Sequence, residues 1–84
     1  MDMKKLEFCI SETDLCLRSL VVKDPRAEIL IKFARDYFSD ALHYRKKEVY
    51  DTALEATAYA HGFIDAGVLL GLIEIPGYHL EKSA

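Results

Sequence analysis

The stretch of residues 53–72, ALEATAYAHGFIDAGVLLGL, constrains the fold more than any other part of the chain. From Ala56 onward, its ionisable side chains besides Tyr59 are His61 and Asp65. A helix at a protein surface carries a charged face, so a helix with so few charges must be covered by its neighbours on most sides. His, Asp and Gly interrupt the apolar run too often for a membrane span. The stretch therefore predicts the central helix of a small bundle.

A line of small residues runs along one side of this predicted helix. Ala53, Ala60 and Gly67 recur every seven residues, and Gly71 lies beside them on a helical wheel. Small side chains let a neighbouring helix approach closely. Each glycine costs a helix about 1 kcal/mol relative to alanine, a cost that close packing would offset. We therefore expect these four residues to mark a close helix contact.

Two amphipathic helices are predicted before the central one. Residues 2–21 place apolar side chains at the a and d positions of a heptad pattern, with Thr13 in the one polar slot. A second helix is predicted over residues 25–46. Asp24 is a favourable residue at a helix N-cap, and Pro25 is favourable at the first helical position because it has no amide hydrogen to leave unpaired.

The central helix is predicted over residues 49–72. Residues 47–51 must contain the chain reversal, although they include neither Gly nor Pro, because two long apolar helices so close in sequence fold into an antiparallel hairpin. Pro76 and Gly77 form a turn that cannot continue a helix, which leaves residues 73–84 as a short non-helical tail. The 84 residues are thus predicted to form a single all-α domain, a three-helix up-and-down bundle.

Composition narrows the class of protein. The formal net charge is −3, which argues against a surface that binds nucleic-acid phosphates. The one basic cluster, residues 45–47, is typical of a helix C-terminus. Cys9 and Cys16 lie about 10 Å apart along the first predicted helix, too far for a disulfide. Two free thiols with no secretory signal predict a cytoplasmic protein.

Two polar side chains in the apolar central helix need an explanation. His61 and Asp65 are four residues apart, so they lie on one helical face, and buried polar groups must be hydrogen-bonded. In the simplest interpretation Asp65 accepts a hydrogen bond from His61 and fixes the helix register. Tyr37 and Tyr44 of the second helix are the alternative donors. In a sharper interpretation Asp40 joins His61 and Asp65 in a metal or acid/base site between the two helices.

Two sequence elements resemble a known family. YFSDAL, residues 37–42, contains its Tyr-x-x-Asp-Ala element, and YAHGFIDAGVLLGL, residues 59–72, contains its Tyr-Ala-(His or Tyr)-Gly-x-x-Asp-Ala-Gly signature. On these elements the chain resembles the archaeal family called domain of unknown function 357. The resemblance covers about residues 25–72 and implies a left-handed, up-and-down three-helix bundle from an archaeon, without implying an activity. The chain departs from the family pattern at Lys47 and Glu48, where a Gly-Asp-like pair is expected.

The apolar pattern favours a structural or protein-interaction module over an enzyme. The second and third helices have apolar arcs wider than one neighbour covers. Four large apolar residues also exceed the needs of a single core: Phe8, Leu15, Phe63 and Leu70. Exposed apolar patches usually mark a partner, so we expect a protein partner or a homodimer.

Two other functions stay open from the sequence. One is a metal-binding or acid/base enzyme that uses the inter-helix Asp and His cluster, and the other is an RNA-associated protein. No Glu-x-x-His or His-Glu-x-x-His motif is present, so no metal and no other cofactor is expected. Nucleic-acid binding and membrane association are likewise not expected.

Overall fold

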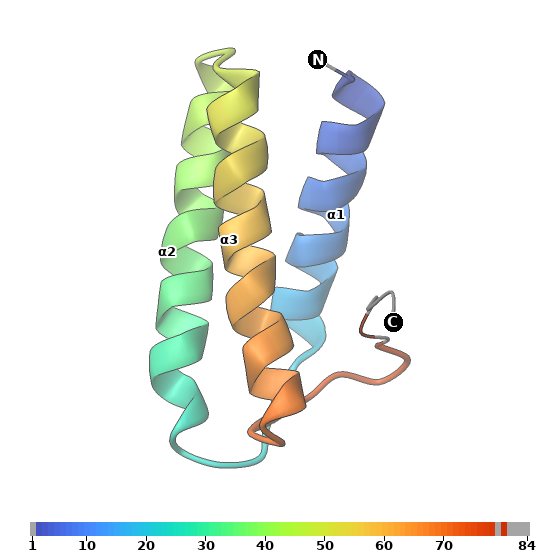
Figure 1. Ribbon diagram of the computed structural model, residues 1–84, viewed down its shortest axis with the longest axis vertical. Helices are drawn as coiled ribbons and strands as arrows, with labels where there is room; N and C mark the ends of the chain where they lie inside the picture. Colours follow the sequence, from blue (N-terminus) through green and yellow to red (C-terminus); the bar gives the residue numbers. More distant parts are fainter. Residues whose placement is uncertain (1, 79, 81–84) are drawn as a thin grey trace.

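Three helices make up most of the fold in the computed structural model, which describes residues 2–78 and residue 80. They are α1 (Met3–Ser19), α2 (Ala27–Lys46) and α3 (Tyr50–Leu69). In Figure 1, α1 and α3 run in one direction and α2 in the other. The chain is therefore an all-α, up-and-down bundle, as the sequence predicts. Of the tail predicted after the third helix, residues 79 and 81–84 lie outside the described residues.

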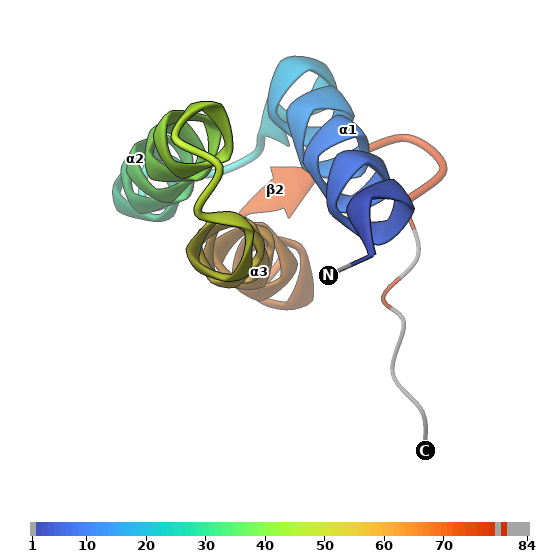
Figure 2. The ribbon, with the colours of Figure 1, turned by 90° about the horizontal axis from the view of Figure 1, so that it is seen from above.

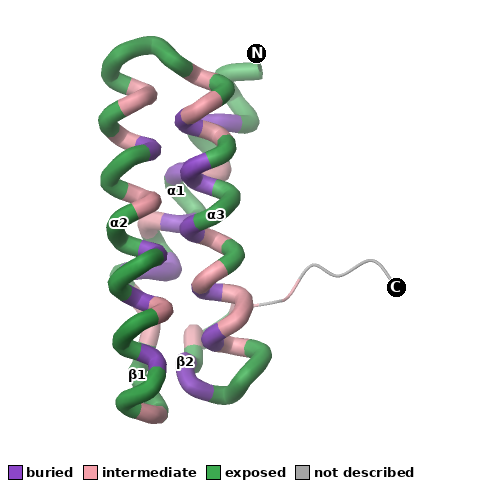
Figure 3. The backbone as a smooth tube through the Cα atoms, turned by 60° about the vertical axis from the view of Figure 1, so that its left-hand side comes forward, coloured by how far each residue is buried: buried purple, intermediate pink, exposed green. Residues whose placement is uncertain are grey.

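Two short strands are present that the sequence did not predict. β1 (Val21–Val22) pairs with β2 (Ile73–Glu74) in the antiparallel direction. Seen from above, β2 lies between the helices (Figure 2), and both strands lie at one end of the bundle (Figure 3). The first helix was predicted to continue through residue 21, but the β-branched Val21 and Val22 lose side-chain freedom in a helix and favour an extended chain. The strand pair ties the segment after α1 to the segment after α3.

α2 starts at Ala27, two residues later than predicted. The Asp24 carboxylate still accepts a hydrogen bond from the backbone amide of Arg26 at 2.8 Å, as the side chain of a capping residue does. The amides of Ala27 and Glu28 donate to carbonyls only three residues back, so the first turn is tighter than an α-helix. Hydrogen bonds from the Arg26 side chain and amide lower the pKa of Asp24 to about 2. Asp24 therefore caps a tight turn that leads into α2.

Gly71 ends α3 and does not belong to the packing stripe in which it was expected. Its φ is +72°, in the left-handed region. The amide of Leu72 donates to the carbonyl of Gly67 at 2.9 Å, and the amide of Gly71 donates to that of Val68 at 3.1 Å. These are the two bonds of a Schellman motif, a common helix C-terminus. The predicted third helix thus ended three residues too late, because the backbone reverses at Gly71.

Glu48 has the same role at the turn between α2 and α3. Its φ is +62°, and its amide donates to the carbonyl of Arg45 at 3.0 Å. The amide of Val49 donates to the carbonyl of Tyr44 at 2.9 Å, which completes a second Schellman motif. A residue with a side chain costs about 1–2 kcal/mol in the left-handed conformation. The hairpin therefore turns without glycine, at a cost in stability.

Alanines fill the interior of the hairpin at a spacing of seven residues on both helices. Five of them have no exposed surface: Ala27, Ala34 and Ala41 on α2, and Ala53 and Ala60 on α3. Such small side chains allow two helices to pack at the short end of the usual 8–10 Å range.

The two glycines within α3 have opposite surroundings. Gly67 is buried, and a Cβ placed there would collide with Cδ1 of Ile73 from β2. Gly67 therefore makes room for the Ile73 side chain, and not for the backbone of another helix as expected. Gly62 is exposed, and a Cβ there would meet no atom of the described residues within 4 Å. Buried residues lie on the inner faces of the helices (Figure 3). The larger ones include Leu6, Ile10, Leu17 and Ile64.

The same substitution should have opposite effects at these two glycines. We expect Gly67→Ala to lower the free energy of unfolding by about 1–2 kcal/mol, because overpacking against Ile73 exceeds the gain in helix propensity. Gly62→Ala should raise it by about 0.5–1 kcal/mol, because only the propensity changes. Urea denaturation followed by circular dichroism measures both. Shifts of the same sign would contradict these different packing roles.

Replacing Glu48 with glycine should stabilise the hairpin turn. Relief of the left-handed backbone exceeds the entropy cost of glycine, so Glu48→Gly should raise the free energy of unfolding by about 0.5–1 kcal/mol. The control is Glu55→Gly at an exposed position within α3, which should lower it by a similar amount. A destabilised Glu48→Gly protein would mean that the Glu48 side chain contributes more than its backbone costs.

Candidate functional site

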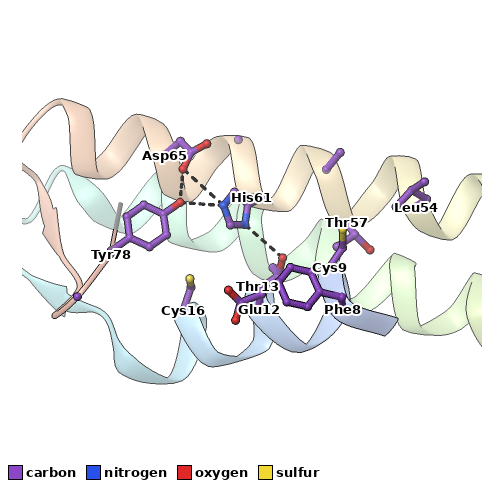
Figure 4. A pocket seen from close by; sticks show the side chains of 13 residues that line it. Phe8, Cys9, Glu12, Thr13, Cys16, Leu54, Thr57, His61, Asp65 and Tyr78 are labelled. Atoms are coloured by element: carbon purple, nitrogen blue, oxygen red, sulfur yellow. Dashed lines mark hydrogen bonds and ion pairs between the residues drawn. The ribbon is translucent and has the colours of Figure 1, made fainter. Parts of the chain in front are cut away.

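A groove of about 550 Å³ lies between α1 and α3 (Figure 4). The wall from α1 consists of Phe8, Cys9, Glu12, Thr13 and Cys16. The wall from α3 consists of Leu54, Thr57, Ala58, His61, Gly62 and Asp65. Gly77 and Tyr78, from the segment after β2, close one end. The groove therefore brings the buried Thr13 and Thr57 together with the partly exposed His61 and Asp65.

A chain of hydrogen bonds crosses the groove through His61. Its Nδ1 lies 3.4 Å from the hydroxyl of Thr13, and its Nε2 lies 2.9 Å from the hydroxyl of Tyr78. The Tyr78 hydroxyl donates its one proton to the carboxylate of Asp65. The Tyr78 oxygen must then accept from His61, which assigns the ring proton of a neutral His61 to Nε2 and makes Nδ1 the acceptor for Thr13. The network thus joins α1, α3 and the C-terminal segment.

Tyr78 is the residue that sequence reasoning missed. The expected donors to Asp65 were His61, Tyr37 and Tyr44, whereas the closest donor comes from the segment predicted as a tail. His61 Nε2 is 3.6 Å from the same Asp65 oxygen, beyond hydrogen-bond range. The sequence signal for Tyr78 is weak, a single aromatic after a Pro-Gly turn. Its position depends on the reversal at Gly71 and on strand pairing that the pattern did not predict.

Asp40 and Tyr37 do not line this groove. Asp40 is exposed on α2. Tyr37 is half-buried and stacks on Tyr59, with ring centroids 5.3 Å apart. The helix that faces His61 across the groove is α1 and not α2, so the structure brings His61 and Asp65 together without Asp40.

Burial and negative charge oppose ionisation at the inner end of the groove. The pKa of Cys16 is raised, mainly by burial and further by the charges of Glu12 and Asp65. The pKa of Tyr78 is raised by burial and by its hydrogen bond to Asp65. Cys16 is thus a poor thiolate nucleophile at neutral pH. Within residues 2–78 and 80, no three His, Cys, Asp or Glu side chains are grouped so that they could hold a metal ion.

These features define a class of protein, the small α-helical bundle in which a close-packed hairpin carries a third helix. The chain belongs to the family described as a protein of unknown function, DUF357, whose family model matches residues 19–73. The matched part contains α2 and α3 entire, whereas nearly all of α1 lies before it. No curated protein matches the chain, and no solved structure does. Within the described residues, no helix is both long and apolar enough to cross a membrane.

Removal of the Tyr78 hydroxyl should weaken the fold in a pH-dependent way. At pH 7, Tyr78→Phe should lower the free energy of unfolding by about 1–2 kcal/mol, because His61 and Asp65 lose a half-buried hydrogen-bond partner. The folded-state pKa of Tyr78 is raised, so its stabilisation is present below the unfolded pKa of about 10 and is lost as the pH rises above it.

The measurement is urea denaturation of the two proteins from pH 7 to pH 11. The stability difference between the native chain and Tyr78→Phe should shrink above pH 10. Tyr59→Phe, at an exposed ring, is the control and should change stability by less than about 0.5 kcal/mol at every pH. A difference that stays constant to pH 11 would contradict the hydrogen bond to Asp65.

Proposed function

We propose that this protein is a protein-interaction module that docks a partner through the outer face of the α2–α3 hairpin. The supporting observation is a ladder of four stacked rings, two from each helix. Phe33 stacks on Phe63 at 5.3 Å, Tyr37 lies 5.8 Å from Phe63, and Tyr37 stacks on Tyr59 at 5.3 Å. Phe33 is 42% exposed and Tyr59 is 61% exposed, although aromatic rings usually gain most by burial.

The ladder is part of a larger apolar surface. Ile29 lies one helical turn before Phe33 and is 58% exposed, and Leu70 lies two turns after Phe63 and is 67% exposed. We call the whole surface the aromatic face; it consists of Ile29, Phe33, Tyr37, Tyr59, Phe63 and Leu70. Stacking holds the rings in place before any partner arrives, which reduces the entropy lost on binding. Pre-ordered aromatic side chains at the centre of a patch are typical of interface hot spots.

A second copy of the chain is the simplest partner for this face. In a twofold dimer the same patch occurs on both sides, so its charged rim must contain both signs in order to pair with itself. The rim beside Phe33 contains Lys32 and Asp36, which form an exposed ion pair at 2.9 Å. A rim with both signs of charge favours binding to a second copy of the chain over binding to a partner that is strongly acidic or strongly basic.

An acid/base enzyme is the second candidate, supported by the chain of hydrogen bonds through His61. It ranks second because the polar atoms of that chain already satisfy one another, as in a network that holds helices in register. RNA association has less support. Arg45 of the basic cluster is engaged with Glu7 across the bundle at 2.8 Å.

The mass in solution tests the proposed function. We expect size exclusion with light scattering to show a concentration-dependent rise from 9.6 kDa toward twice that mass. Tyr59→Glu places a charge within the ring ladder and should weaken the dimer at least about tenfold, as loss of a hot spot does. Leu15→Glu, at a 52% exposed position on α1, is the matched control and should leave the dimer intact.

Two results would contradict self-association through the aromatic face. One is a monomer at every concentration up to about 1 mM, because a dimer with a dissociation constant below that value would be detected. The other is equal weakening by Tyr59→Glu and Leu15→Glu, which would indicate nonspecific association of exposed apolar residues.

A further inference from the structure

We propose that the groove between α1 and α3 is the docking site for an amphipathic helix of a partner protein, a helix that carries apolar residues and one Lys or Arg. The site does not depend on the proposed function. Its α3 residues, such as His61 and Asp65, lie on the side of α3 opposite Tyr59 and Phe63 of the aromatic face.

The walls of the groove have the length and direction that a helix requires. Its residues on α3 run from Leu54 to Asp65, about 16 Å or three turns at 1.5 Å per residue. Those on α1 run from Phe8 to Cys16. The two helices run in the same direction (Figure 1), so a further helix laid between them would complete a four-helix arrangement.

The exposed part of the α3 wall is made of small residues. Ala58 and Gly62 are exposed, one turn apart, and a Cβ at Gly62 would meet none of the described atoms within 4 Å. Large side chains there would hold a partner helix away, whereas small ones permit close contact. Gly62 also costs α3 stability relative to alanine, a cost that its own packing does not offset.

The charges of the groove favour a bound helix that carries a positive charge. Among residues 2–78 and 80, its lining contains the carboxylates of Glu12 and Asp65 and no Lys or Arg. Asp65 lies beside Tyr78 at one end of the groove, and Glu12 lies one turn beyond Phe8 toward that end (Figure 4). The Asp65 side chain is 32% exposed and can still be reached by a cation. A Lys or Arg on the occupant would complement this end, while an acidic residue would be repelled.

The other end of the groove is apolar. Leu54 lines it from α3, and Phe8, which is 66% exposed, lines it from α1. A partner helix should therefore present apolar side chains about two turns away from its Lys or Arg. Such helix-in-groove recognition reads residues at positions i, i+4 and i+7 along one face.

The first experiment selects the occupant from a defined probe. A displayed library of 15-residue Ala/Gln-based helices, with positions i, i+4 and i+7 randomised, is selected against the immobilised full chain. We expect enrichment of Leu, Ile or Phe at the two positions toward one end, and of Lys or Arg at the third. The proposal is overturned by a library that yields no binder, or by binders without the basic residue.

The second experiment locates the binding of a synthesised consensus peptide by calorimetry. A Cβ at position 62 would meet none of the described atoms within 4 Å, and leucine is a better helix former than glycine. Gly62→Leu should therefore not lower the melting temperature, while its side chain, placed in the groove wall, should weaken peptide binding at least about tenfold. Glu12→Gln should weaken it about two- to fivefold, the range for an exposed ion pair. Glu55→Gln, exposed on α3 outside the groove, should leave the affinity unchanged.

Other outcomes separate the competing occupants. Unchanged peptide affinity in Gly62→Leu would overturn the groove as the site. If Gly62→Leu instead lowers the solution mass of the protein measured without peptide, a second copy of the chain occupies the groove. That result would overturn the proposed partner helix. Tyr59→Glu should leave peptide binding unchanged, so failure of the aromatic face and failure of the groove can be told apart.

Discussion

The reversal of the backbone at Gly71 is the constraint on which most of the structure after α3 depends. Its left-handed φ ends the helix, and two Schellman hydrogen bonds hold the turn. The reversed chain then places Ile73 against Gly67 and pairs β2 with β1. It also carries Tyr78 to the groove, where the Tyr78 hydroxyl donates a hydrogen bond to Asp65. A helix that continued through residue 71 would leave Gly67 without its cover and Asp65 without its donor.

The helices could be predicted from the sequence because their signals are local and repeat many times. Apolar periodicity over 17 to 20 residues determined the number of helices and their order. The ends were less accurate, since Gly71 could be read either as a small packing residue or as a helix terminator. The strand pair could not be predicted, because residues such as Val22 and Ile73 meet only after the whole bundle has formed. Two-residue strands also leave too short a pattern to recognise.

The candidate site was predictable in its chemistry and not in its partners. His61 and Asp65 stood out because polar residues in an apolar helix must find hydrogen bonds. Thr13 was visible as the one polar slot of the first helix, yet its pairing with His61 depends on how α1 is rotated against α3. Asp40 has the right chemistry on a helix that faces elsewhere, so composition and spacing alone could not exclude it. Long-range geometry decided each of these partners.

Both proposed surfaces use α3, on opposite sides of one helix, and its inner side explains how they stay separate. The buried alanines pack α3 closely against α2. The rings of Tyr59 and Phe63 are therefore fixed relative to α2, independently of the position of α1. The groove, in contrast, requires α1, most of which lies before the matched residues 19–73. The aromatic face can therefore be examined in any chain that the family model matches. The groove must be examined in chains that also carry an α1 with an acidic residue at the position of Glu12.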